Sequence, residues 1–236
     1  MCRHLGYIGP AVPVREPLTR GDHSLRTQSW APNEMRGGGT INADGFGVAW
    51  WRDGAASRYR NPMPIWSDPA VDEVLPQLRS TAVVAAVRSA TAGMPVSREA
   101  CAPFVDGAWA FSHNGVVQNW RTTLAAAHSL ELEAPTDSAA LWLLLRDSLA
   151  TAEPAAAIRA VVNTVLAVAP DARLNLLLSN GEMLWATTCY HSLSVLVDDA
   201  SVTVASEPVD DNSDWQSIPD RSVVIAEPGN LAIESL

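Results

Sequence analysis

Residues 136–190 read TDSAALWLLLRDSLATAEPAAAIRAVVNTVLAVAPDARLNLLLSNGEMLWATTCY, and this stretch decides the fold class. It begins with the apolar spacing of a helix that Thr136 or Asp137 caps, and residues 153–169 form a second helical segment with a proline in its first turn. Residues 173–190 then have the pattern of a β-hairpin around an Asn-Gly pair. Two helices followed by a hairpin differ from the strand–helix–strand alternation of a parallel sheet.

Segments typical of β-strands flank this stretch on both sides. Before it, strands are predicted at residues 4–9, 45–54, 81–91 and 107–115, the last stopping at an Asn-Gly turn. After it, residues 193–206 and 222–235 are predicted to form two more hairpins. Residues 15–39 are expected to be irregular, and residues 116–128 have helical spacing. We therefore predict an α+β fold with two antiparallel sheets and helices on the outside, as one domain over residues 1–236.

The composition narrows the class of protein. The chain has 236 residues, of which 47% are apolar and 18% charged, so it can bury a core. Its net charge of −10 disfavours nucleic acid or an anionic membrane as the main partner. We expect a cytoplasmic protein, because no stretch approaches the roughly 20 apolar residues that span a bilayer, and no signal peptide is recognisable.

Cysteines and histidines show no metal-binding pattern. The three cysteines, Cys2, Cys101 and Cys189, form no CxxC pair, and the five histidines are scattered. This disfavours a disulfide framework and a zinc site, and we expect neither metal nor cofactor. Cys101 is expected in a loop beside a pocket, and Cys189 as a small buried apolar residue.

Cys2 directly follows the initiator methionine. Methionine is generally removed before a small residue, so the mature chain is expected to begin at Cys2. A free α-amine has a pKa of about 7.7–8.0 and a thiol one of about 8.5, so the amine can accept the thiol proton near neutral pH. Cys2 would then be a thiolate nucleophile that needs no separate histidine.

Three motifs after Cys2 place polar side chains at predicted strand ends or at a helix start. They are RSAT with Arg88 and Thr91, SHNG with His113, Asn114 and Gly115, and TDS with Asp137. Each motif alone is ordinary. Together with Cys2 and the glycine-rich segment GGGTINADGFGVAWW, they resemble the class II glutamine amidotransferases of the N-terminal-nucleophile hydrolase superfamily, over essentially the whole chain.

The resemblance implies a four-layer αββα sandwich and a covalent mechanism. Cys2 would attack the side-chain carbonyl of a γ-glutamyl amide and form a γ-glutamyl thioester. The Asn114 side-chain amide and the Gly115 backbone N–H would form the oxyanion hole. Such donors stabilise the charge that develops on the carbonyl oxygen, and the loss of one typically costs about 3 kcal/mol.

The resemblance also implies a set of residues that binds the glutamyl end of the substrate. Arg88, whose planar fork suits bidentate contact, would bind the α-carboxylate, with a donor from Thr91 beside it. Asp137 would pair with the α-ammonium group. His113 belongs to this set as a positioning or structural residue, because the mechanism assigns the role of base to the α-amine.

Further segments narrow the resemblance to the γ-glutamyl hydrolases of ergothioneine biosynthesis. They are MCRH, NADGFG, RSATAGMPV, APFVDG and SEPVDDNSDWQSIPDRSVV. This family hydrolyses γ-glutamyl-hercynylcysteine sulfoxide to glutamate and hercynylcysteine sulfoxide. We expect an independent hydrolase, since the sequence shows no acceptor domain that would use ammonia. Ser206 and Glu207 are expected to border the pocket without a chemical role.

Two other functions stay open: a glutaminase subunit that supplies ammonia to a separate synthetase, and a non-catalytic relative that binds a γ-glutamyl ligand. The hydrolase hypothesis adds one expectation, because the trimethylammonium group of hercynine is best held by aromatic faces or carboxylates. One tryptophan is expected near the Cys2 thiol. The candidates are Trp30, Trp51, Trp109 and Trp215, with Glu207, Asp210 and Asp211 as candidate carboxylates.

Overall fold

The computed structural model describes residues 2–36, 41–129 and 131–236. The expected removal of Met1, and residues 37–40 of the glycine-rich segment, lie outside the described residues. One sheet consists of β1 (Arg3–Pro13), β2 (Phe46–Arg52), β3 (Ala55–Asn61), β4 (Arg79–Val87), β9 (Ser194–Val197), β10 (Val202–Ala205) and β11 (Gln216–Ser217). The other consists of β5 (Phe104–Asp106), β6 (Trp109–Val116), β7 (Arg173–Ser179), β8 (Leu184–Thr188), β12 (Ser222–Glu227) and β13 (Asn230–Ser235).

The strand order places the beginning of the chain in the middle of the first sheet. That sheet has the order β11-β9-β10-β1-β4-β2-β3, and the second has the order β13-β12-β8-β7-β6-β5. Each pairing between the described strands is antiparallel. Across the sandwich, β4 packs against β6, and β1 packs against β6 and β7.

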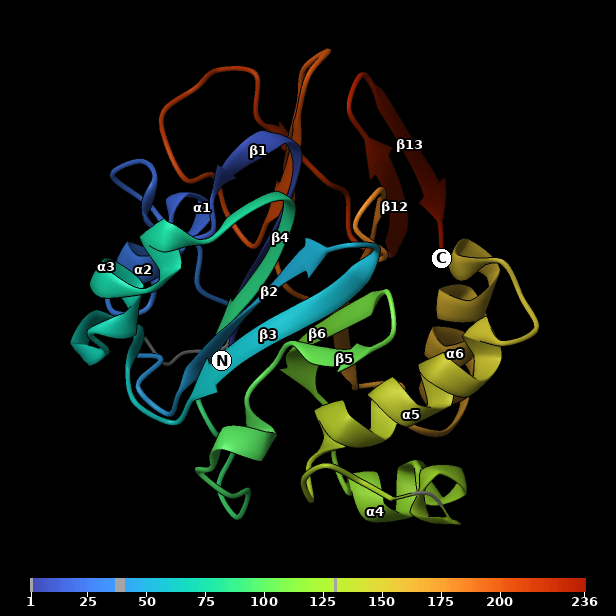
Figure 1. Ribbon diagram of the computed structural model, residues 1–236. Helices are drawn as coiled ribbons and strands as arrows, with labels where there is room; N and C mark the ends of the chain where they lie inside the picture. Colours follow the sequence, from blue (N-terminus) through green and yellow to red (C-terminus); the bar gives the residue numbers. More distant parts are fainter. Residues whose placement is uncertain (1, 37–40, 130) are drawn as a thin grey trace.

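Helices cover the outer faces of both sheets (Figure 1). The helices α1 (Glu16–Thr19), α2 (Leu25–Gln28) and α3 (Ala70–Glu73) lie on the first sheet, while α5 (Asp137–Leu149) and α6 (Pro154–Val168) lie on the second. Three apolar clusters correspond to the two helix–sheet interfaces and the interface between the sheets. The predicted α+β fold of two antiparallel sheets flanked by helices, in the αββα order, is confirmed.

The strongest periodic signals predicted their elements correctly. The Thr136 side chain caps α5 by accepting the Ala139 N–H at 3.2 Å, and α6 begins at its proline. The hairpins β7–β8, β9–β10 and β12–β13 are present where the sequence predicts them.

Other predicted elements were wrong. Asn114-Gly115 does not form a turn, because β6 runs through it, with Asn114 paired to Asn175 and Gly115 to Leu174 on β7. Residues 116–128 form α4 (Trp120–Thr123) and a 3₁₀ segment, Ala125–Ser129, rather than one helix. The segment 15–39, expected to be irregular, contains α1 and α2. Strand β3 was not predicted.

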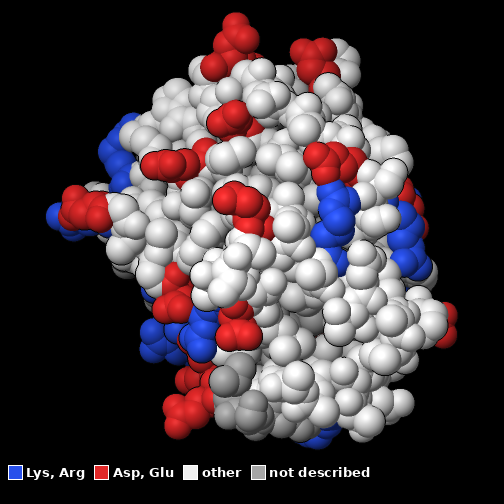
Figure 2. Space-filling view, turned by 90° about the vertical axis from the view of Figure 1, so that its right-hand side faces the viewer, with Lys and Arg blue, Asp and Glu red and all other residues white. Residues whose placement is uncertain are grey.

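The described helices include none with the length and apolar character needed to cross a bilayer. Figure 2 shows acidic and basic side chains interspersed over the face of α5 and α6, with acidic ones more numerous, as the net charge of −10 implies. A continuous basic surface, which a nucleic-acid backbone would require, is not visible on that face.

Candidate active site

The pairing of β1 with β4 brings Cys2 and Arg88 to the same edge of the first sheet. Arg3 pairs with Val87, so Cys2 directly precedes the first residue of β1 while Arg88 directly follows the last residue of β4. Cys2 is partly exposed, and its Sγ lies 3.8 Å from the Ser89 carbonyl oxygen. The sheet register therefore places the thiol beside the arginine, although 85 residues separate them in the chain.

The SHNG motif reaches this edge from the second sheet. His113 is buried, with Nδ1 3.0 Å from Ser138 Oγ and Nε2 2.8 Å from the Arg173 carbonyl oxygen. These two contacts fix the imidazole between α5 and β7. His113 therefore has the surroundings of a positioning residue.

One small pocket brings the residues of both sheets together. It is lined by Cys2, Ala86, Val87, Arg88, Ala100, Ala102, His113 and Ser138. Three of the predicted site residues, Cys2, Arg88 and His113, thus share a cavity. Ser138 was not predicted, although it lies next to Asp137 in the TDS motif.

Asn114 and Gly115 follow His113 on β6. Asn114 is fully buried, its Nδ2 donates to Ser206 Oγ at 3.4 Å, and its Oδ1 has no protein partner among the described residues. A Cβ added to Gly115 would lie 1.9 Å from the Arg173 carbonyl oxygen. No side chain fits there, so β6 and β7 approach closely at the residue whose N–H is the predicted oxyanion donor.

Asp137 lies at the first turn of α5 and is 3% exposed. Its Oδ2 accepts the Val117 N–H and its Oδ1 accepts the Ser138 N–H, both at 2.8 Å. The Ser138 hydroxyl is a second donor to Oδ1 at 3.5 Å, so the carboxylate joins α5 to the end of β6, and Oδ2, with one donor among the described residues, keeps a lone pair for a ligand. Thr91 is exposed in the turn after Arg88, and its carbonyl accepts the Met94 N–H at 2.9 Å.

The NADGFG segment, residues 42–47, holds the backbone around Arg88. Asp44 N–H donates to the Arg88 carbonyl at 3.0 Å, Arg88 N–H donates to the Gly45 carbonyl at 2.8 Å, and Ala90 N–H donates to Asp44 Oδ2 at 2.7 Å. Gly45 has φ +121°, and a Cβ there would lie 2.4 Å from Cys101 Sγ. Among the described residues, the guanidinium of Arg88 donates only to the Pro95 carbonyl, at 2.8 Å, which leaves its other N–H groups for a ligand.

Ser206 and Glu207 follow β10, on the other side of β1 from Arg88. Ser206 Oγ accepts the His4 N–H at 3.0 Å, so it connects the start of β1 to Asn114. Glu207, 1% exposed, accepts the N–H groups of Asn33 and Glu34 at 3.0 and 2.7 Å and lies 3.4 Å from the Arg3 guanidinium. Protein donors therefore occupy Glu207, and it does not offer a free carboxylate to a substrate cation.

The other two cysteines are buried thiols. Burial raises the pKa of Cys101 to about 11, and burial also raises the pKa of Cys189, so both remain protonated at neutral pH. Ala100 and Ala102 line the pocket, which confirms the predicted pocket-side segment, while the Cys101 side chain itself points to the carbonyls of Ser97 and Asn61. Cys189 is the small buried residue that the sequence predicts.

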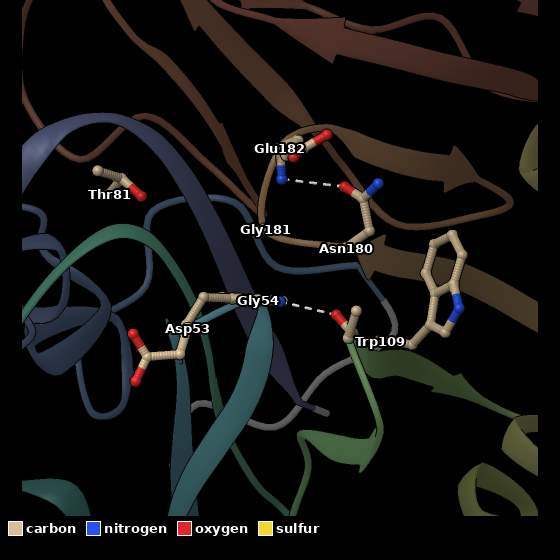
Figure 3. A pocket seen from close by; sticks show the side chains of 9 residues that line it. Asp53, Gly54, Thr81, Trp109, Asn180, Gly181 and Glu182 are labelled. Atoms are coloured by element: carbon tan, nitrogen blue, oxygen red, sulfur yellow. Dashed lines mark hydrogen bonds between the residues drawn. The ribbon is translucent and has the colours of Figure 1, made fainter.

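The expected tryptophan near the thiol is wrong for the described pocket, whose lining includes none. Trp51 and Trp109 line a different hollow with Asp53, Thr81 and Glu182 (Figure 3). That hollow lies at the far end of the strands, because Thr81 is near the start of β4 and Arg88 follows its end. Trp30 packs edge to face on Trp66 at 5.6 Å, and Trp215 Nε1 donates to Asp210 Oδ1 at 2.8 Å.

The chain is similar in sequence and in structure to known proteins. The family model for class-II glutamine amidotransferases matches residues 22–200. Two solved structures share the fold. One is a glutamine aminotransferase class-II domain protein from Silicibacter pomeroyi, with a TM-score of 0.70 and 23% identity, covering 100% of this chain and 99% of that one. The other is a glutamine phosphoribosylpyrophosphate amidotransferase from Bacillus subtilis, with a TM-score of 0.71 and 16% identity, covering 99% of this chain and 49% of that one.

The fold and the full-length sequence similarity define the class of protein. The chain belongs to the class-II glutamine amidotransferase family. Among its relatives, it is 42% identical over 236 residues to the γ-glutamyl-hercynylcysteine sulfoxide hydrolase of Mycobacterium tuberculosis, covering 100% of this chain and 97% of that one. It is 39% identical to the enzyme of the same name in Mycolicibacterium smegmatis, with both chains fully covered.

Proposed function

We propose that this protein hydrolyses the γ-glutamyl amide bond of γ-glutamyl-hercynylcysteine sulfoxide, releasing glutamate and hercynylcysteine sulfoxide. The observation that carries the proposal is the pocket at the sheet edge, where the partly exposed thiol of Cys2 lies beside Arg88. The identity over the full chain to hydrolases of that name supports the choice of substrate.

The chemistry begins with removal of Met1, which leaves the α-amine of Cys2 free to take the thiol proton. The Cys2 thiolate attacks the γ-carbonyl carbon, and Asn114 Nδ2 and Gly115 N–H stabilise the oxyanion. The C–N bond breaks, the leaving amine takes the proton from the α-ammonium, and a γ-glutamyl thioester remains. Water, deprotonated by the α-amine, then attacks the thioester and releases glutamate and the Cys2 thiol.

Recognition of the glutamyl end uses the pocket wall on the β4 side. The Arg88 guanidinium binds the α-carboxylate, with Thr91 nearby as a further donor. Asp137, whose Oδ2 has one donor among the described residues and keeps a lone pair, accepts the α-ammonium group. His113 positions this wall through its contacts with Ser138 and with the Arg173 carbonyl.

Glutamate release by the purified protein tests the proposal. The N-terminus is first verified by mass spectrometry, and γ-glutamyl-hercynylcysteine sulfoxide and glutamine are then compared as substrates. We expect a much higher kcat/KM for the former. Activity on glutamine alone, stimulated by a copurifying synthetase, would instead establish the ammonia-supplying glutaminase, and no glutamate from either would support the non-catalytic relative.

Replacing the nucleophile separates binding from chemistry. We expect Cys2→Ala to abolish turnover and to retain substrate binding by calorimetry, because Arg88 and Asp137 are unchanged. Cys101→Ala is the matched control and should retain turnover, since Cys101 is fully buried. Turnover by Cys2→Ala at the rate of the unmodified enzyme would disprove the mechanism.

We also infer a cytoplasmic location and no role for nucleic acid. The three free thiols suit a reducing compartment, and the net charge of −10 opposes binding to a phosphate backbone. The single-domain organisation over residues 1–236 stays a prediction.

A further inference from the structure

Arg173 and Arg36 both contact Tyr190, and neither belongs to the proposed glutamyl-binding residues. In the first sheet, β4 and Arg88 flank β1 on one side and β10 flanks it on the other. In the second sheet, β6 lies under both β4 and β1, while β7 lies under β1. Arg173, the first residue of β7, is therefore displaced from Arg88 toward β10.

The backbone carbonyl of Arg173 lies beside the SHNG motif. Its oxygen lies 2.8 Å from His113 Nε2, and Gly115 can approach that carbonyl only because it lacks a Cβ. When the glutamyl chain extends from the carbonyl carbon at Cys2 toward Arg88, the amide nitrogen on that carbon points to the opposite side. The leaving amine therefore points toward the start of β7.

Tyr190 holds the arginine side chain at this place. The Arg173 guanidinium lies 4.1 Å from the centre of the Tyr190 ring, a cation–π contact. Tyr190 is 38% exposed and has φ +94°, a conformation unusual for a residue with a side chain. Its N–H donates to Asp220 Oδ1 at 2.8 Å, and its carbonyl accepts Arg36 Nη1 at 2.8 Å, so both backbone groups are fixed.

The charges of both arginines are uncompensated by the described protein. Neither Arg173 nor Arg36 has a carboxylate oxygen within 4.0 Å among the described residues, whereas Arg3 pairs with Glu207. The neighbouring imidazole adds no charge, because burial and then Arg173 lower the pKa of His191 to about 3. In a chain of net charge −10, two guanidinium groups that both contact Tyr190 and have no carboxylate partner among the described residues suit an anionic ligand.

We propose that Arg173, held against Tyr190 and assisted by Arg36, binds a carboxylate on the α-carbon of the leaving amine. The inference rests on the proposed function and names the substrate class: γ-glutamyl amides of amino acids rather than of ammonia or simple amines. In γ-glutamyl-hercynylcysteine sulfoxide the leaving nitrogen belongs to the cysteine part, whose α-carbon bears a carboxylate. A guanidinium fork matches that group with two parallel hydrogen bonds.

Two substrates that differ only in this carboxylate test the subsite: γ-glutamylalanine and γ-glutamylethylamide. We expect the wild-type protein to prefer γ-glutamylalanine. Arg173→Gln should lower kcat/KM for γ-glutamylalanine about tenfold or more, mainly through KM, as removal of a charge-assisted hydrogen bond does. The same variant should change kcat/KM for γ-glutamylethylamide less than about twofold. Arg173→Lys should recover part of the preference, and Tyr190→Phe should keep it, since the ring face makes the contact.

Arg52→Gln is the matched control, because it removes one positive charge at the far end of β2 and should leave both substrates unaffected. Thermal unfolding of each variant checks that the fold is retained. Equal losses of Arg173→Gln on both substrates would overturn the subsite while leaving the hydrolase intact.

Calorimetry in the Cys2→Ala background separates the subsite from the reaction. Tighter binding of γ-glutamylalanine than of γ-glutamylethylamide, lost in Cys2→Ala/Arg173→Gln, supports the subsite even if the wild-type protein releases no glutamate. Equal affinities for the two compounds in Cys2→Ala would overturn it, whatever the activity of the wild type.

Discussion

At the scale of single residues, pairing with a strand distant in sequence can override the structure that a short sequence pattern predicts. Asn114-Gly115 has the composition of a tight turn, yet both residues pair with β7 inside a strand. Pairing with β7 and burial outweigh the local preference of the pair. The turn, inferred from local chemistry, was wrong, whereas the oxyanion-hole role that the family resemblance implies for these residues stays a prediction.

Arg88→Ala should raise KM for a γ-glutamyl amide about tenfold or more, because the charge-assisted contact with the substrate carboxylate is lost. The effect on kcat should be smaller, since the thiol is unchanged. Steady-state kinetics of glutamate release measure both constants. Arg79→Ala, at the other end of β4, is the control and should behave as the wild type. An unchanged KM in Arg88→Ala would remove its assigned role.

Gly115→Ala should lower kcat about 100-fold, because the added Cβ pushes β6 away from the Arg173 carbonyl and displaces an oxyanion donor. The control is Gly54→Ala in the β2–β3 turn, where a Cβ meets nothing within 4 Å. Its φ of +77° costs about 1 kcal/mol of stability in alanine, without an effect on kcat. Single-turnover rates of glutamate release compare the Gly115→Ala and Gly54→Ala variants. A normal kcat in Gly115→Ala would contradict the role of the Gly115 N–H as an oxyanion donor.

At the scale of elements, the sequence predicted what periodicity encodes. The helices α5 and α6 and the three C-terminal hairpins carry strong patterns with caps or turn residues, and all are present. What it missed depends on contacts between distant segments. Nothing local marks Ser206 as the link between β1 and Asn114, or Tyr190 as a residue with positive φ. The expectation that Trp51 or Trp109 lies near the Cys2 thiol failed for the same reason, because only the direction of the strands shows which end of the sheets holds the site.

Glu207 accepts two N–H groups of the segment 31–36 and pairs with Arg3 of β1, and this contact gives a prediction at the element scale. Glu207→Gln should lower the free energy of unfolding by about 3–5 kcal/mol, because it leaves the buried Arg3 guanidinium unpaired. Asp72→Asn is the matched control: its ion pairs with Arg15 and Arg26 are exposed, and its loss should cost about 1 kcal/mol or less. Urea unfolding measures the free energy of unfolding of both variants. Equal losses in Glu207→Gln and Asp72→Asn would show that the Arg3–Glu207 ion pair is no stronger than a surface pair.

At the scale of the whole molecule, the site exists because strands of the two sheets end at the same side of the sandwich. Arg3–Val87 pairing ends the β1–β4 ladder and Val116–Arg173 pairing ends the β6–β7 ladder, both at the same side of the sandwich. This arrangement buries polar side chains between the sheets. Both ring nitrogens of His4 and Nδ1 of His191 lack protein partners among the described residues.

These histidines make the stability of the whole fold depend on pH. Burial lowers the pKa of both His4 and His191 to about 3, with further lowering from neighbouring charges that include Arg3 and His113. An unfolded chain protonates its histidines below a pH of about 6.5, while the folded protein does not until a pH of about 3. The unfolded state therefore binds more protons in this window, so stability is constant above a pH of about 6.5 and falls as the pH drops toward 3.

Between pH 7.0 and 5.5, above the range where carboxylates titrate, each histidine should cost about 1 kcal/mol of unfolding free energy. Urea unfolding at the two pH values should therefore show a loss of about 2 kcal/mol in the wild type, and about half of that in His4→Met, which cannot be protonated. His23→Met is the control, because His23 lies near the surface and should keep the full loss. The same pH dependence in His4→Met and the wild type would mean that His4 is charged in the folded protein, and the layer between the sheets would then have to hold a cation next to the nucleophile.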